Sequence, residues 1–149
     1  MKKFKFRLEA LENIKGMELD ALRQAFAAAQ AELWKTEGEL IVARDTLDAT
    51  YNELAELRIA QAEPLILLSL ESYTGVLREQ IRGLRQRITE QRQQLKEAQE
   101  RVAEKHKEKK VLEKYRERKF IEYNANLERE IQQELDEIAQ NMHHPEERI

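Results

Sequence analysis

The chain has 149 residues, and its 26 Lys and Arg against 29 Asp and Glu leave a net charge of −3. Four glycines and two prolines are too few for the many turns of an all-β or α/β domain, so a mostly helical chain is expected. The absence of cysteine excludes disulfide scaffolds, thiol catalysis and Cys-based zinc sites. The negative net charge disfavours general nucleic-acid binding.

Pro64 is the only proline before Pro145, and long helical sequences flank it. Proline interrupts a helix interior and disfavours helical geometry at the preceding residue, so it predicts a single turn. We expect a first helix over about 4–62, a turn over about 63–66, a second helix over about 67–141 and a tail over 142–149. The predicted fold is all-α: one domain, residues 1–149, formed by a long antiparallel two-helix coiled-coil hairpin with a C-terminal helical overhang.

The first helix carries a heptad seam, in which seam residues recur in alternating steps of three and four. Its a positions are large and most of its d positions are small. The seam runs through Leu19, Leu22, Phe26, Ala29, Leu33, Thr36, Leu40, Ala43, Leu47, Thr50, Leu54 and Leu57.

The second helix repeats the pattern through Leu77, Ile81, Leu84, Ile88, Gln91, Leu95, Ala98, Val102 and, further on, Leu112. The preferred register sets Thr50 against Ile81, so that large residues meet small ones, and it centres the turn between Leu65 and Ile66. In an alternative register, one heptad shorter, each residue of the first helix faces a residue of the second helix that is seven positions earlier. This alternative packs about as well but sets Lys15 against Lys109. A stutter at Lys15, together with seam lysines at 105 and 109, predicts looser pairing near the termini.

Charge supports the hairpin. Residues 8–63 contain 12 acids and 5 bases, and residues 64–127 contain 15 bases and 10 acids, so the two arms are complementary. The end of the second helix is acidic and carries an apolar stripe that the first helix is too short to cover. This stripe comprises Leu127, Ile131, Leu135, Ile138 and Met142.

No catalytic or metal-binding motif is present, so neither an enzyme nor a cofactor is expected. Nine Lys and Arg from Arg101 to Lys119 alternate with acids at helical spacing, which is typical of a solvated face. No array of aromatic residues for base stacking accompanies them, so the cluster favours docking of an acidic protein over nucleic-acid binding. The longest apolar run, 65–68, is far shorter than the roughly 20 residues of a membrane span, and no signal peptide is recognisable. Membrane insertion is therefore not expected.

Two exposed apolar groups could bind partners. Trp34 falls on the outer face of the first helix with Ile41 one heptad further on, and it could either anchor a partner or lie over neighbouring side-chain stems. Tyr51 and Tyr73, with the run 65–68, could form a second surface or pack within the turn.

The sequence resembles the FliJ family of the bacterial flagellar type III export apparatus. The resemblance is carried by Phe-Lys-Phe-Arg-Leu-Glu at 4–9, the Ala-rich stretch 27–33, the segment 110–118 and the closing segment 130–140, and it extends over nearly the whole chain. The apolar turn after Pro64 departs from the more polar, Gly-containing connection of the family.

The resemblance implies a cytoplasmic stalk, peripherally associated with the inner membrane at the flagellar base and monomeric in isolation. Its implied partners are the hexameric export ATPase, the cytoplasmic domain of the membrane export gate, and empty export chaperones. The implied ATPase-ring contacts are Phe4, Phe6, Arg7, Leu8, Lys114, Arg116, Arg118 and Lys119. The implied gate or partner patch comprises Tyr51, Tyr73, Leu77, Gln80 and Leu84, to which Trp34 and Ile41 are added from their position on the outer face.

Two other classes of function remain open on the sequence alone. A tentacle-type holding chaperone would grasp unfolded clients with exposed apolar tips. A passive tether or dimerising coiled coil would use the heptad seam between chains.

Overall fold

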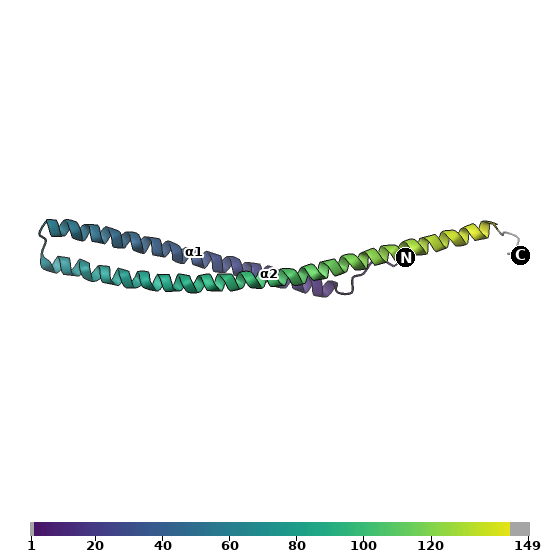
Figure 1. Ribbon diagram of the computed structural model, residues 1–149, viewed down its shortest axis with the longest axis horizontal. Helices are drawn as coiled ribbons and strands as arrows, with labels where there is room; N and C mark the ends of the chain where they lie inside the picture. Colours follow the sequence, from purple (N-terminus) through teal and green to yellow (C-terminus); the bar gives the residue numbers. More distant parts are fainter. Residues whose placement is uncertain (1, 144–149) are drawn as a thin grey trace. The chain divides into compact units, whose positions relative to one another are not determined.

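The computed structural model describes residues 2–143, which form two helices and no strand (Figure 1). Helix α1 spans Glu9–Ile59 and helix α2 spans Pro64–His143. The prediction of an all-α helical hairpin is thus confirmed. Contacts divide the chain into two units, which we call the hairpin unit (residues 20–103) and the terminal unit (residues 2–19 with 104–143).

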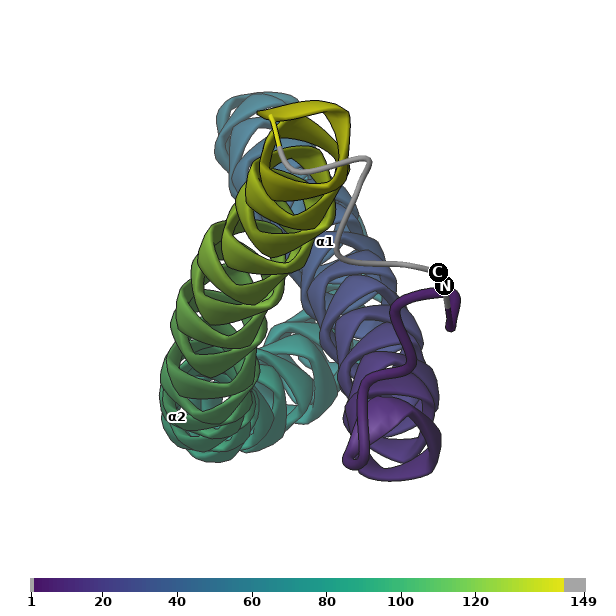
Figure 2. The ribbon, with the colours of Figure 1, turned by 90° about the vertical axis from the view of Figure 1, so that its right-hand side faces the viewer.

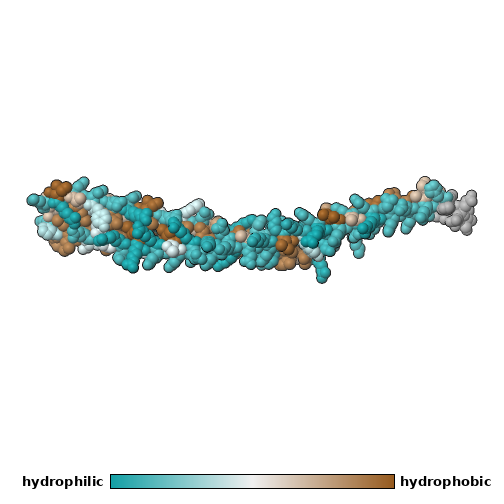
Figure 3. Space-filling view, viewed as in Figure 1, coloured by the Kyte–Doolittle hydropathy of each residue, from teal (hydrophilic) through white to brown (hydrophobic). Residues whose placement is uncertain are grey.

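The core of the hairpin unit is the predicted heptad seam. Leu33, Leu40 and Ala43 of α1 are buried in one cluster with residues of α2, namely Ile81, Leu84 and Ile88. The visible face of the molecule is largely hydrophilic, with smaller hydrophobic patches between the hydrophilic side chains (Figure 3). Burying apolar area at about 25 cal/mol per Å² is the main stabilising contribution to such a seam.

Threonines fill several of the small seam positions. Thr36, Thr50 and Thr74 are 2–5% exposed, and each hydroxyl donates a hydrogen bond to a carbonyl of its own helix at 2.6–3.0 Å. The buried hydroxyls are therefore satisfied without a partner across the seam.

The turn is closed by backbone hydrogen bonds. Gln61 adopts a left-handed conformation with φ 53°, its N–H donates to Arg58 O at 3.2 Å, and the Ala62 N–H donates to Leu57 O at 3.0 Å. This pair of bonds is a Schellman motif that ends α1. The carbonyl of Glu63 then accepts from the N–H groups of Ile66 and Leu67 at the start of α2.

Pro64 begins α2, three residues earlier than predicted. The first residue of a helix needs no N–H donor and proline already has helical φ, so a proline is well suited to that position. The turn, residues 60–63, therefore has the same length as the predicted 63–66 but lies three residues nearer the N-terminus.

The preferred register is wrong, and the register one heptad shorter agrees with the structure. Within the terminal unit, Lys105 Nζ lies 2.7 Å from Glu18 Oε2 and Lys15 Nζ lies 2.9 Å from Glu108 Oε2. The preferred register would have set Glu18 opposite position 113, whereas the shorter one sets it opposite position 106, next to Lys105. The physical reason is the position of the turn: α1 ends at Ile59 and α2 starts at Pro64, so the chain reverses about three residues earlier than predicted and each residue of α1 faces an earlier residue of α2.

The first helix begins at Glu9, five residues later than predicted, and residues 2–8 are not helical (Figure 2). Phe4 and Phe6 alternate with basic residues, a period of two that suits extended chain. Four basic residues at a helix N-terminus would also oppose its dipole, whereas Glu9 and Glu12 in the first turn of α1 complement it.

Helix α2 continues past its packed part, and every residue from 128 to 143 is exposed. This is the predicted overhang, and its apolar stripe is 53% exposed at Leu135 and 77% exposed at Met142. The predicted tail begins inside the helix, since α2 ends at His143, and residues 144–149 of that tail lie outside the described residues. No segment of residues 2–143 has the length and hydrophobicity that a membrane-crossing helix requires.

Candidate partner-binding surfaces

Residues 2–8 of the terminal unit, which we call the N-terminal strap, are held on α2 by aromatic rings. The ring of Phe4 lies 5.2 Å from that of Phe120 and 5.5 Å from that of Tyr123, and the ring of Phe6 lies 5.9 Å from that of Tyr115. The Tyr123 hydroxyl donates a 2.6 Å hydrogen bond to the carbonyl of Lys2. We call these five rings the aromatic clamp; such pairs contribute about 0.5–1.5 kcal/mol each beyond the area that they bury.

Cationic side chains surround the clamp. The Arg116 guanidinium lies 5.9 Å from the centre of the Phe6 ring, and Lys119 Nζ lies 5.5 Å from the centre of the Tyr115 ring. Lys119 also donates to the Glu122 carboxylate at 3.2 Å, and this hydrogen bond raises the pKa of Lys119. Arg116 is anchored by Glu12 of α1 at 3.4 Å, so α1 and the strap both help to position it.

A hollow of about 1070 Å³ lies between the strap and α2. Five of its lining residues are cationic and only one is acidic: Lys2, Lys3, Lys5, Arg7 and Lys119 against Glu122. With aromatic walls and this excess of positive charge, the hollow is suited to an acidic segment of a partner protein.

The structure brings together part of the predicted ATPase-ring contact. Phe4 and Phe6 contact α2 next to Arg116 and Lys119, which are the predicted neighbours. Phe6 is only 7% exposed, so its side chain holds the strap and is not free for a partner. Phe4 and Leu8 are half-buried, whereas Arg7, Lys114 and Arg118 are exposed.

Sequence reasoning did not find Tyr115, Phe120 and Tyr123 as partners of the strap. A signal was available, because five of the nine aromatic residues of the chain lie in residues 4–6 and 115–123. Two aromatic groups far apart in a chain with so few rings indicate mutual contact.

Four charged residues occupy the stuttered seam of the terminal unit. Glu18 accepts from Lys105, which lowers the pKa of Glu18, and Glu108 accepts from Lys15 and Lys105, which lowers the pKa of Glu108. The same hydrogen bonds raise the pKa of Lys105. We call Lys15, Glu18, Lys105 and Glu108 the charged seam; ion pairs join the two helices here, where lysines interrupt the apolar pattern.

The predicted gate patch is divided between surface and core. Leu77 and Leu84 are 4% and 5% exposed and belong to the seam, so only their neighbours can contact a partner. Tyr73 and Gln80 are exposed and line a hollow of about 410 Å³ with Val42 and Thr46 of α1.

The other predicted anchors lie outside that hollow. Trp34 is 63% exposed and Ile41 58%, and Tyr51 is 42% exposed. The alternative in which Trp34 lies flat over its neighbours is therefore disfavoured. The Tyr51 ring is partly covered, as expected for a residue beside the helix pair.

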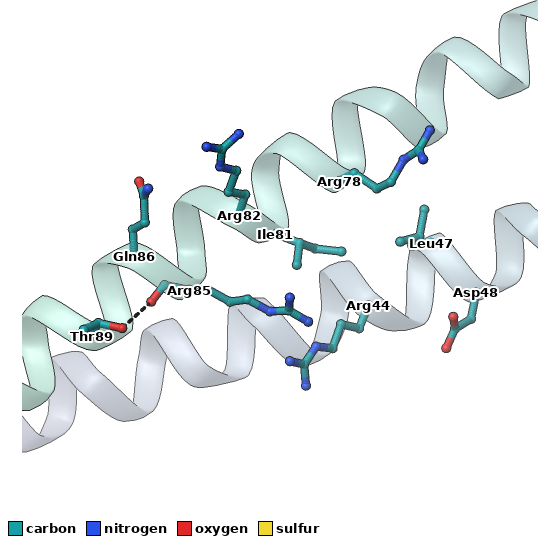
Figure 4. A pocket seen from close by; sticks show the side chains of 9 residues that line it. All are labelled: Arg44, Leu47, Asp48, Arg78, Ile81, Arg82, Arg85, Gln86 and Thr89. Carbon is teal, nitrogen blue, oxygen red and sulfur yellow. Dashed lines mark hydrogen bonds between the residues drawn. The ribbon is translucent and has the colours of Figure 1, made fainter.

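A second hollow in the hairpin unit was not expected from the sequence. Four of its nine lining residues are arginines, namely Arg44, Arg78, Arg82 and Arg85 (Figure 4). The signal for it was the heptad spacing of Arg78 and Arg85. Among residues 2–143, no group of three or more His, Cys, Asp or Glu side chains is placed to hold a metal ion.

Comparison with known proteins identifies the family. No curated protein and no solved structure matches the chain. A family model described as "Flagellar FliJ protein" matches residues 4–148. This match covers both units and nearly the full length of the sequence, and the chain therefore belongs to the flagellar FliJ protein family.

Proposed function

We propose that this protein is a non-enzymatic stalk that binds the hexameric flagellar export ATPase through its terminal unit. Membership of the FliJ family makes the chain a component of flagellar protein export. The proposal goes further in naming the partner and the surface, and it places the protein on the cytoplasmic side of the flagellar base.

The observation that carries this proposal is the aromatic clamp. By fixing the strap on α2, the clamp holds the basic residues of both segments in one place before any partner arrives. Preorganised groups lose less conformational entropy on binding, so the same charges bind more tightly than they would on a free chain end. An asymmetric cationic surface of this kind would contact only some subunits of a ring at a time.

Titration of the protein into the purified export ATPase tests the proposal. We expect a substoichiometric amount to increase both ATP hydrolysis and the hexameric fraction, because contact with several subunits favours ring assembly. Lys114→Glu/Arg118→Glu alters exposed side chains without disturbing the clamp and should weaken the effect about tenfold or more.

Lys35→Glu/Lys96→Glu is the matched control, since it makes the same charge change on exposed residues of the hairpin unit. It should behave as the unaltered protein does. If the unaltered protein changes neither the rate nor the oligomeric state of the ATPase, the proposal fails.

For the export gate we propose the hollow beside Tyr73 and Gln80, with Trp34 and Ile41 as further anchors. The partner is the cytoplasmic domain of the gate protein, and the same exposed surface could receive empty export chaperones during recycling. Calorimetric titration with the purified gate domain should show binding that Tyr73→Ala/Gln80→Ala weakens. Exposed positions were chosen because Leu77 and Leu84 cannot be truncated without damage to the seam.

A holding chaperone is the second candidate, favoured by apolar side chains that stay exposed around the turn. Ile59 is 85% exposed, Leu65 74% and Leu68 60%. Such a group can bind unfolded clients. Suppression of the aggregation of an unrelated protein, with no effect on the ATPase, would favour this function.

A further inference from the structure

The arginine-lined hollow of the hairpin unit, which we call the arginine groove, is independent of the surfaces assigned above. Arg44 comes from α1, and Arg78, Arg82 and Arg85 come from α2. The hollow measures about 630 Å³, and Leu47 and Ile81 project toward one another at its floor (Figure 4). Asp48 is its one acidic lining residue.

Heptad spacing shows that these arginines interrupt a row of ion pairs. Glu71, Arg78, Arg85 and Arg92 recur every seven residues on α2, and Glu37, Arg44 and Arg58 are separated by multiples of seven on α1, so all of them line one edge of the helix pair. At one end of the row Arg92 pairs with Glu37 at 3.3 Å, and at the other Arg58 pairs with Glu71.

Between those two pairs the edge carries Arg44 on α1 and Arg78 and Arg85 on α2, and Tyr51 occupies the remaining heptad position of α1. Within residues 2–143, no ion pair joins Arg44, Arg78 or Arg85 to a carboxylate, and Arg82 has only a 3.9 Å contact with Glu79 of its own helix. Like charges along a coiled-coil edge are unfavourable, and oppositely charged residues would have stabilised the pairing. A local arrangement that costs stability is typical of a binding surface.

We propose that the arginine groove binds an acidic amphipathic helix of a partner protein. The carboxylates of that helix would pair with the guanidinium groups at the rim, and its apolar face would cover Leu47 and Ile81. Planar guanidinium groups form two parallel hydrogen bonds with a carboxylate, which makes arginine better suited than lysine to this role.

The shape and chemistry of the groove favour a protein helix over nucleic acid. Two parallel ridges with an apolar floor are the usual receptor for an amphipathic helix. Single-stranded nucleic acid needs aromatic surfaces for base stacking, and no aromatic residue lines this hollow. The charge is also confined to a short stretch of the edge and does not continue as a track for a phosphate backbone.

The binding of a designed peptide to the full chain tests this proposal. The probe is a fluorescein-labelled, capped peptide of about 18 residues with leucine at a and d positions and glutamate beside them, long enough to form a helix on binding. Fluorescence anisotropy at about 50 mM salt, where charge interactions are weakly screened, gives the affinity. We expect Arg78→Gln/Arg85→Gln to weaken binding about tenfold or more, because two rim contacts are lost.

The control double variant, Arg101→Gln/Arg129→Gln, removes two exposed arginines of α2 outside the groove and should change the affinity less than about twofold. Circular dichroism checks that both variants keep their helices. Failure of the peptide to bind the unaltered chain, or equal binding by the groove variant, overturns the proposal.

Three further measurements distinguish an amphipathic protein helix from other molecules that could occupy the groove. A peptide with serine in place of leucine should bind much more weakly; equal binding would overturn the role of the apolar floor. Tighter binding of a short DNA duplex, with the same dependence on Arg78 and Arg85, would overturn the assignment to a protein. A dimer of the chain that dissociates in the groove variant would assign the groove to a second copy and overturn the assignment to a partner protein.

Discussion

Gln61 carries the most unusual backbone conformation among the described residues. Its φ of 53° lies in the left-handed region, which costs a residue with a Cβ roughly 1–2 kcal/mol. Gln61 nonetheless adopts this conformation, because it allows the N–H groups of Gln61 and Ala62 to donate hydrogen bonds to the last carbonyl groups of α1. Glycine is the usual residue at this place in the motif.

We therefore predict that Gln61→Gly raises the free energy of unfolding by about 0.5–1 kcal/mol. The relief of strain exceeds the greater chain entropy that glycine brings to the unfolded state. Ala55→Gly, at an exposed position inside α1, should instead lower it by about 1 kcal/mol. Denaturant unfolding of the two variants decides the matter, and a destabilised Gln61→Gly would contradict the left-handed geometry.

The charged seam predicts a dependence of stability on pH. The pKa values of Glu18 and Glu108 are lowered below 4.5 in the folded chain, so their contribution is present above about pH 4.5 and is lost as the pH falls through the lowered values. The pKa of Lys105 is raised above 10.5, so its contribution is complete below that pH and is lost only in strong alkali. The seam is thus intact between about pH 5 and pH 10.

We expect Glu18→Gln/Glu108→Gln to reduce the decrease in melting temperature between pH 7 and pH 3, because part of that decrease comes from protonation of these two carboxylates. Thermal unfolding followed by circular dichroism measures it. Glu117→Gln/Glu128→Gln removes two exposed carboxylates that lie outside the network and should leave the decrease nearly unchanged. An equal decrease in all three proteins would show that the charged seam does not titrate with folding.

At the scale of elements, the N-terminal strap is held by side chains of α2. Substitution of the α2 partners leaves the strap sequence, and hence its trypsin sites, unaltered. We predict that Phe120→Ala/Tyr123→Ala releases the strap and increases the rate of tryptic cleavage after Arg7 about tenfold or more, because two ring contacts and the bond to Lys2 are lost.

Mass spectrometry of the cleaved chain gives this rate. Trp34→Ala, which removes an exposed ring in the hairpin unit, should leave cleavage after Arg7 unchanged. If the α2 variant is cut no faster than the unaltered chain, the strap is not held by the clamp.

The elements differ in how well the sequence predicted them. Leu33, Leu40 and Leu54 at a positions, and Ala43 and Thr50 at d positions, are buried as the heptad pattern required. The register could not be chosen in the same way, because a repeat of seven residues looks nearly the same after a shift of seven. The position of the turn determines the register. The turn is closed by backbone hydrogen bonds, which do not depend on a repeating pattern of side chains that could be recognised in the sequence.

The binding surfaces were predicted less completely than the fold. Phe4 and Phe6 were found through the resemblance to FliJ, but their partners on α2 were not, because the signal for them is the clustering of aromatic residues in two distant segments and not a periodic pattern within one helix. Leu77 and Leu84 were assigned both to the heptad seam and to the gate patch. The structure buries them in the seam, and a buried side chain cannot also belong to an exposed patch. The arginine groove was overlooked because each of its arginines is ordinary by itself.

For the molecule as a whole, charge complementarity favours pairing of the two arms. Glu37 and Glu39 of α1 pair with Arg92 and Arg87 of α2 at 3.3 and 3.6 Å. Exposed pairs of this kind contribute about 0–1 kcal/mol each, so they select orientation and register more than they stabilise. The same pairing of arms could form within one chain or between two chains. Disulfide cross-linking of introduced cysteines distinguishes these two arrangements.

The chain contains no cysteine, so two introduced cysteines can pair only with each other. We predict that Thr50→Cys/Thr74→Cys oxidises to a disulfide within a monomer of 17.7 kDa, because the observed register sets these buried positions in one layer. Thr50→Cys/Ile81→Cys, which tests the longer register, should not form an intramolecular bond, since one heptad displaces the residue by about 10 Å and a disulfide tolerates at most about 7 Å between Cα atoms. Light scattering and non-reducing gels give the mass. A covalent dimer of the first variant would mean that the arms are exchanged between chains, and the stalk would then be a two-chain assembly.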